Sequence, residues 1–124
     1  MNTYMQLAGR ILLAIIFVLS GIAKARDPSG TAAYMQAMGV PTLLVWPTAA
    51  LEFFGGLAII VGFQTRWAAL ALAAFCLLAA AIFHSNLADE IQMINFLKNL
   101  AMAGGFLMLA SSGTTALSVD GRKK

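Results

Sequence analysis

Charged side chains are scarce in this chain. Asp, Glu, Lys and Arg make up 10% of its 124 residues, whereas hydrophobic residues make up 60%. A soluble domain carries about 25% charged residues, so this composition excludes a soluble globular protein and predicts an integral membrane protein. The net charge of +3 is small and the basic residues are dispersed. We therefore do not expect nucleic acid as a partner.

Thiol and imidazole groups are nearly absent, with one cysteine, Cys76, and one histidine, His84. A lone cysteine excludes an internal disulfide and the Cys-x-x-Cys chemistry of membrane thiol oxidoreductases. We expect Cys76 to be a small buried hydrophobic residue. One histidine excludes bis-histidine haem ligation within the chain, and there is no Cys-x-x-Cys-His attachment sequence. The carboxylates have no recognisable metal-ligand spacing, so we predict neither a metal nor haem.

Long apolar runs dominate what remains. They cover residues 7–24, 43–63, 67–87 and 95–113, and an apolar helix of about 20 residues crosses a bilayer. We therefore predict an all-α membrane fold in which residues 1–124 form a single domain, a four-transmembrane-helix bundle. Gly-Gly pairs at 55–56 and 104–105 allow helices to approach closely in lipid. Such pairs serve packing within the chain and a homo-oligomer equally well.

The connections between the runs carry turn signals. Asp27-Pro28 is typical of a helix start, and Gly39 followed by Pro41 is typical of a helix end. These signals predict a short surface helix within residues 31–38. Residues 64–66 alone separate the second and third runs, which predicts a tight antiparallel hairpin.

The basic residues indicate the orientation. With the N-terminus inside, five of them fall on the cytoplasmic side (Arg10, Arg66, Arg122, Lys123, Lys124) and three fall outside (Lys24, Arg26, Lys98). The positive-inside rule then favours cytoplasmic N and C termini. We interpret the basic C-terminal triplet as a topology signal. We expect Arg10 to snorkel to lipid phosphates at the cytoplasmic face.

Glu52 is the most informative single residue. It is the one charge in the 21-residue run 43–63 and lies near its middle. An ionisable group at that depth costs a few kcal/mol or more unless a partner or water receives it. Glu52 is therefore a candidate functional residue by default.

Other polar side chains are predicted at a similar depth, in the outer half of the bundle. They end the first and third runs or open the fourth, and they are Ser20, Lys24, His84, Lys98 and Asn99. Together with Glu52 they have three chemical uses. They can hold the helices together as a buried ion-pair network, relay protons, or bind the polar end of a lipid-soluble ligand.

Five short segments in this order resemble one protein family. They are IFVLSGIAK at 16–24 (preceded by Arg10), MGVP at 38–41, LEFFGG at 51–56, GFQTR at 62–66 and FLKNLAMAGG at 96–105. The pattern is similar to that of the DoxX family of small bacterial inner-membrane proteins. The likeness extends over roughly residues 7–113.

The resemblance implies a four-helix fold in the bacterial inner (plasma) membrane and a redox setting. The family takes its name from a subunit of a terminal quinol oxidase, relatives form part of a thiosulfate:quinone oxidoreductase, and others are associated with oxidative-stress defence. We therefore expect a quinone-binding accessory subunit of a membrane oxidoreductase, in contact with membrane lipid and redox partner subunits. Whether the chain is an enzyme by itself stays open.

Roles for individual residues follow from this expectation. Lys24, Lys98 and Asn99 would bind the quinone, while Glu52 and His84 would exchange the proton. The alternative is a structural or assembly membrane protein whose buried polar cluster only fixes helix packing. That reading assigns no ligand to the cluster.

Overall fold

The computed structural model describes residues 2–84, 86–112 and 117–122. Four of its helices are long and apolar enough to cross a membrane. They are α1 (Asn2–Arg26), α3 (Val45–Val61), α4 (Thr65–Phe83) and α5 (Glu90–Ser112). The described part of the chain also contains the short helices α2 (Pro28–Ala37) and α6 (Val119–Arg122) and the 3-10 turn η1 (Thr42–Leu44). The predicted all-α fold with four candidate membrane helices is confirmed.

Helix ends differ from the ends of the apolar runs. Helix α1 begins five residues before position 7, and α5 begins five residues before position 95. Both helices extend into polar sequence because backbone hydrogen bonding does not depend on hydropathy. Helix α4 ends at Phe83 instead of near residue 87, since His84 leaves the helical region with φ −129°.

The residues that signal turns in the sequence lie at helix ends in the structure. Asp27 Oδ1 accepts a hydrogen bond of 3.0 Å from the Gly30 N–H and so caps α2, which starts at Pro28. Gly39 and Gly62 both have φ +75°, a left-handed conformation that glycine adopts without steric cost. They end α2 and α3 respectively, and Gly62 starts the short turn to α4.

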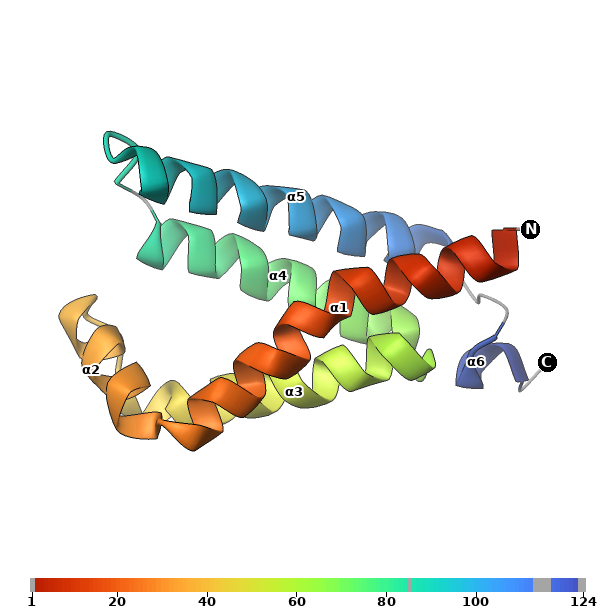
Figure 1. Cartoon of the computed structure of the whole chain (residues 1–124), viewed down its shortest axis with the longest axis horizontal. Helices are drawn as coiled ribbons and strands as arrows, with labels where there is room; N and C mark the ends of the chain where they lie inside the picture. Colours follow the sequence, from red (N-terminus) through yellow and green to blue (C-terminus); the bar gives the residue numbers. More distant parts are fainter. Residues whose placement is uncertain (1, 85, 113–116, 123–124) are drawn as a thin grey trace.

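The four long helices associate mainly as two pairs. Helix α1 packs along α3, and α4 packs along α5, whereas α3 meets α4 less extensively and α1 barely touches α5 (Figure 1). Glycine permits the first pairing, because a Cβ on Gly21 would lie 2.8 Å from Phe53 Cβ and one on Gly56 would lie 2.8 Å from Val18 Cγ2. The four long helices therefore do not pack equally closely on one another, although the predicted four-helix bundle suggested it.

A hydrophobic core joins the two pairs. Phe17 of α1 makes edge-on contact with Phe106 of α5, with ring centroids 5.4 Å apart. Leu72 and Cys76 of α4 complete this region and are fully buried. The prediction that Cys76 is a small buried hydrophobic residue is confirmed.

The two ends of the bundle are built from different short elements. At the α2 end lie α2, η1 and the connection from α4 to α5; at the α6 end lie the start of α1, the α3–α4 turn and α6 (Figure 1). The start of α1 and helix α6 share one end, as an even number of spans requires. That this end faces the cytoplasm stays a prediction from the basic residues.

The C-terminal segment folds onto the α6 end. The Asp120 carboxylate accepts hydrogen bonds of 2.8 Å from the Gln64 and Thr65 N–H groups, so it caps α4 from across the chain. Asp120 N in turn donates to Gly62 O. The segment is therefore held by the α3–α4 turn, a contact that the sequence did not reveal.

Arg10 completes this contact, and its predicted snorkelling is wrong. Its side chain is 1% exposed, and Nη2 donates to Leu117 O at 2.7 Å. Arg10 faces the α3–α4 turn and the C-terminal segment rather than lipid, while its Nε and Nη1 are buried and donate no hydrogen bond to the described residues. The basic triplet at 122–124 lies outside the side chains that the structure describes.

Candidate functional site

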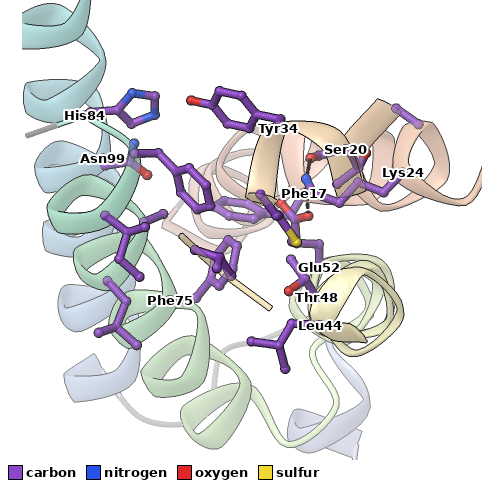
Figure 2. A pocket seen from close by; sticks show the side chains of 18 of the residues that line it. Phe17, Ser20, Lys24, Tyr34, Leu44, Thr48, Glu52, Phe75, His84 and Asn99 are labelled. Atoms are coloured by element: carbon purple, nitrogen blue, oxygen red, sulfur yellow. Dashed lines mark hydrogen bonds and ion pairs between the residues drawn. The ribbon is translucent and has the colours of Figure 1, made fainter. Parts of the chain in front are cut away.

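A cavity of about 950 Å³ opens between the two helix pairs at the α2 end. Its walls come from α1 and α3 on one side and from α4 and α5 on the other, with α2 at the rim (Figure 2). The sparse contact between the pairs leaves this space. Five of the six residues of the predicted polar cluster line it, namely Ser20, Lys24, Glu52, His84 and Asn99.

An ion pair joins the first two membrane-spanning helices, α1 and α3, at this cavity. Lys24 Nζ lies 2.6 Å from Glu52 Oε1, and the Glu52 side chain is only 5% exposed. Lys24 also donates to Ser20 Oγ, one turn earlier on α1, at 2.8 Å. Helices α1 and α3 pack antiparallel with Gly21 against Ala49 and Phe53, and at this register the Lys24 side chain lies beside the buried carboxylate of Glu52.

The Glu52 carboxylate has hydrogen-bonding capacity to spare. Oε1 is fully buried and accepts no hydrogen bond of good geometry from the described residues, although Lys24 lies within ion-pair distance. A buried carboxylate can accept several hydrogen bonds, and leaving a buried acceptor without one costs about 1–3 kcal/mol. The ion pair alone does not satisfy this group, and the cavity lies beside it.

The opposite wall carries the imidazole and an amide. His84 caps the end of α4, and its Nδ1 lies 2.8 Å from Gln92 Oε1 of α5. Asn99, also on α5, donates from Nδ2 to Asn95 O at 3.1 Å. Both side chains line the cavity across from the Lys24–Glu52 pair (Figure 2), so the site has polar groups on two facing walls.

Aromatic rings shape the cavity and its rim. Tyr34 of α2 stacks on Phe83 of α4 with centroids 5.1 Å apart and 19° between the planes. Deeper inside, Phe17 and Phe75 make edge-on contact at 6.5 Å. Most of the remaining lining is aliphatic, including Ile16, Leu78 and Ile82. The cavity therefore offers an apolar interior with a few fixed polar groups, which is typical of small-molecule sites.

Lys98 does not lie in this site. It is exposed on α5 and is not among the residues that line the cavity. Consecutive residues on a helix point about 100° apart, and on α5 the packing turns Asn99 toward the cavity and leaves Lys98 exposed. Its predicted ligand contact has no support from this geometry.

The structure also brings in residues that the sequence analysis passed over. Tyr34 lies on the surface helix α2, and Thr48 lies one turn before Glu52 on the same face of α3 (Figure 2). The i, i+4 spacing from Glu52 signals Thr48. Nothing in the sequence signals Tyr34, because α2 has to fold back over the bundle before its ring meets Phe83. Among the described residues, no three His, Cys, Asp or Glu side chains form a group that could hold a metal.

Comparison with known proteins agrees with this architecture. The DoxX family model matches residues 5–85. The chain is 48% identical to the inner membrane protein YqjF of Escherichia coli (strain K12), over 92% of this chain and 88% of the relative. It is 35% identical to the inner membrane protein YphA of the same organism, over 94% and 88% respectively.

A more distant match covers about half of each chain. The Bacillus subtilis (strain 168) protein named "Putative oxidoreductase CatD" is 32% identical over 57 residues, which are 46% of this chain and 42% of that protein. No solved structure matches.

Proposed function

Because the chain belongs to the DoxX family and is a multi-pass inner membrane protein, we propose that it binds a lipid-soluble, quinone-type ligand in the cavity at the α2 end. The observation that carries the proposal is the Glu52 carboxylate, 4% exposed, paired with Lys24 at the wall of a large apolar cavity. The name of CatD supports a redox setting.

The cavity suits such a ligand in size and lining. Small-molecule sites occupy roughly 300–1,000 Å³ and are mostly apolar, with a few placed polar groups; this one measures about 950 Å³. The rings of Phe17 and Phe75 line its interior, where a flat conjugated ring packs well. An isoprenoid tail can leave between the loosely joined helix pairs into lipid.

The polar residues take separate roles toward the ligand. Lys24 and Asn99, on opposite walls, hold the oxygens of the head group. Glu52, with His84 across the cavity, exchanges a proton with the head group. A bound quinone supplies two-electron, two-proton chemistry that no side chain here possesses. The chain then works as an accessory subunit together with redox partner subunits.

A structural function is the second candidate. The Lys24–Glu52 pair connects α1 to α3, and a buried ion pair can serve only to fix how helices pack. Under this reading, the cavity holds bulk lipid and no ligand is selected. The two functions differ in what Glu52→Gln changes, either a bound ligand or the stability of the bundle.

The test is extraction of co-purified lipids. Protein purified in mild detergent is extracted with organic solvent, and quinones are quantified by chromatography and mass spectrometry. We expect near-stoichiometric quinone in the parent protein and strong loss in Glu52→Gln and Asn99→Leu. Lys98→Ala, an exposed change on the same helix as Asn99, is the matched control and should retain the ligand. Equal quinone content in all four proteins, or none in the parent, would contradict the proposal.

A further inference from the structure

The short helix α2 lies across the end of the cavity. It turns back from the end of α1 toward the end of α4 (Figure 1). Residues spaced three or four apart from its N-cap onward line the cavity, namely Asp27, Gly30, Thr31 and Tyr34. Positions at this spacing share one face of a helix, so α2 presents that face to the cavity.

We propose that α2 is a lid that closes the cavity to water at the α2 end and leaves it open to lipid between α1 and α4. The inference rests on the proposed function and specifies from which phase its ligand enters. Tyr34 and Phe83 are the latch of this lid.

The latch is an aromatic stack between α2 and α4. The rings of Tyr34 and Phe83 have centroids 5.1 Å apart and 19° between their planes. The main packing of α2 is on α1, η1 and α3, so the stack bridges the mouth of the cavity from one helix pair to the other. Met35, next to Tyr34, also lines the cavity and is 4% exposed. The helix is therefore seated on the cavity rather than raised above it.

Shielding from water suits the polar groups beneath the lid. Lys24 and Glu52 lie 2.6 Å apart, and the carboxylate side chain is 5% exposed. Electrostatic interactions strengthen where water is excluded, and closing a site also prevents leakage of protons to bulk water. A lid over this pair therefore favours the proton exchange proposed for Glu52.

Apolar side chains frame the other opening. Ile16 of α1 and Leu78 and Ile82 of α4 line the cavity and are 52%, 61% and 40% exposed. Toward the middle of the bundle, α1 and α4 meet at Phe17 and Phe75, whose ring centroids are 6.5 Å apart. Between this contact and the lid, the gap between the two helices has apolar walls. A lipid-soluble ligand can enter there without crossing water.

The test is the reaction of a cysteine inside the cavity with two reagents of the same chemistry. Thr48→Cys places a thiol on the cavity wall, one turn before Glu52. The protein is placed in phosphatidylcholine nanodiscs, which leave both faces in buffer. It is labelled with trimethylammonioethyl methanethiosulfonate, which stays in water, or with benzyl methanethiosulfonate, which partitions into lipid. Intact-protein mass spectrometry gives the rates, and the parent chain, whose own Cys76 is fully buried, sets the background.

The lid predicts that the charged reagent is slow until the latch is removed. Adding Tyr34→Ala or Phe83→Ala to Thr48→Cys should raise its rate at least about tenfold, which corresponds to about 1.4 kcal/mol. Tyr34→Phe keeps the stack and should keep the slow rate. The rate of the benzyl reagent should not change, because its path lies between α1 and α4. Tyr4→Ala, an exposed change on α1 at the other end of the bundle, is the matched control and should leave both rates unchanged.

The outcomes separate this inference from the function beneath it. A charged-reagent rate that Tyr34→Ala and Phe83→Ala do not raise overturns the lid, and a benzyl reagent that fails to label Thr48→Cys overturns entry from lipid. Met102→Cys, on the α5 wall of the same cavity, gives a second reporter where Thr48→Cys does not yield folded protein. The assay contains no quinone. Quinone that co-purifies with a freely accessible cavity would therefore refute the lid alone, and a closed cavity without quinone would refute the proposed function alone.

Discussion

Arg10 and Glu52 are both buried charges on membrane-spanning helices, at 1% and 4% exposure, but their surroundings differ. At the α6 end Arg10 donates from Nη2 to Leu117 O of the C-terminal segment, and a cavity of about 610 Å³ between α1 and α5 borders it. At the α2 end Glu52 pairs with the Lys24 side chain and borders a cavity of about 950 Å³. One charge is held by a backbone carbonyl of its own chain, whereas the other is paired with a side chain at the wall of the larger cavity.

This difference separates structural from ligand-binding use of a buried charge. A buried ionisable residue in a membrane helix suggests function by default, and the sequence favoured Glu52 because it lies mid-run, whereas Arg10 lies near the start of its run. What distinguishes the two in the structure is the partner, which is a backbone carbonyl for Arg10 and a side chain for Glu52. The predictions below change one end at a time and ask whether stability and ligand occupancy respond separately.

The largest effect is expected at Arg10. Arg10→Met removes the donor to Leu117 O and a buried positive charge on which the Asp120 carboxylate acts, so the free energy of unfolding should fall by about 3 kcal/mol or more. Unfolding of purified protein in detergent, followed by circular dichroism, measures this loss. Ligand retained per folded molecule should not change. Arg66→Met, an exposed change at the same end, should alter stability by less than about 0.5 kcal/mol; an equal loss in both variants would contradict the assignment.

Two glycines with the same backbone conformation provide the next comparison. Gly39 and Gly62 both have φ +75°, but a Cβ has open space at Gly39 and meets Ser118 and Arg10 at Gly62. Substitution by alanine should lower the free energy of unfolding by about 1 kcal/mol at either position, because alanine is strained in the left-handed backbone conformation. At Gly62 overpacking should add about 1–3 kcal/mol. Similar melting temperatures for the two variants would show that the C-terminal segment does not pack tightly on the α3–α4 turn.

The two aspartate caps should differ more modestly. Asp120 accepts from the N–H groups of Gln64 and Thr65 at the start of α4 and is half-buried, whereas Asp27 accepts from one backbone N–H of α2 and is exposed. Loss of a cap costs about 0.5–2 kcal/mol, so we place Asp120→Ala near the upper value and Asp27→Ala near the lower. Hydrogen exchange of the first turn of α4 should rise in the first variant alone. Unchanged exchange there would remove the capping role.

A small stability change is expected at Glu52. In ligand-free protein, Glu52→Gln should lower the free energy of unfolding by about 1 kcal/mol, because the amide keeps the shape of the carboxylate and its oxygen can still accept from Lys24, which keeps its bond to Ser20 and is partly exposed at 21%. Ligand content should nevertheless fall sharply. A destabilisation as large as that of Arg10→Met, with no change in bound lipid, would favour the structural reading of the cluster.

The sequence was sufficient for the four helices and for much of the α2 end. Glu52 stands out as a charge in an apolar run, and its depth counted from the span ends predicts that Lys24 lies at a similar level. The ion pair of 2.6 Å between the two side chains confirms this. The Asp27 and Gly39 signals also located α2, which begins three residues before the predicted segment 31–38 and ends one residue before its end. These features depend on local pattern and helix length, which one sequence contains.

Features that depend on helix rotation or on long-range contact were not predictable. Lys98 and Asn99 are adjacent, and only the packing of α5 against α4 decides which of them faces the cavity. The contact of Asp120 with Gln64 and Thr65 spans 55 or more positions, and no periodicity signals it. The prediction that Arg10 snorkels to lipid failed for the same reason. Its partner, Leu117 O, lies in the C-terminal segment, where the sequence offers only basic residues as a signal.

The long separation between Arg10 and Leu117 also bears on how the protein is made. Their hydrogen bond joins positions 107 residues apart, and at about 5–20 residues per second the ribosome needs roughly 5 to 20 seconds to cover that distance. The Lys24–Glu52 pair belongs to the first two spans to emerge and can form early. Newly synthesised chains can therefore form the α1–α3 wall of the cavity first, and the contact of Arg10 with the C-terminal segment should form last. A premature stop codon before Leu117 would leave all four candidate spans in place but without the hydrogen bond between Arg10 and Leu117.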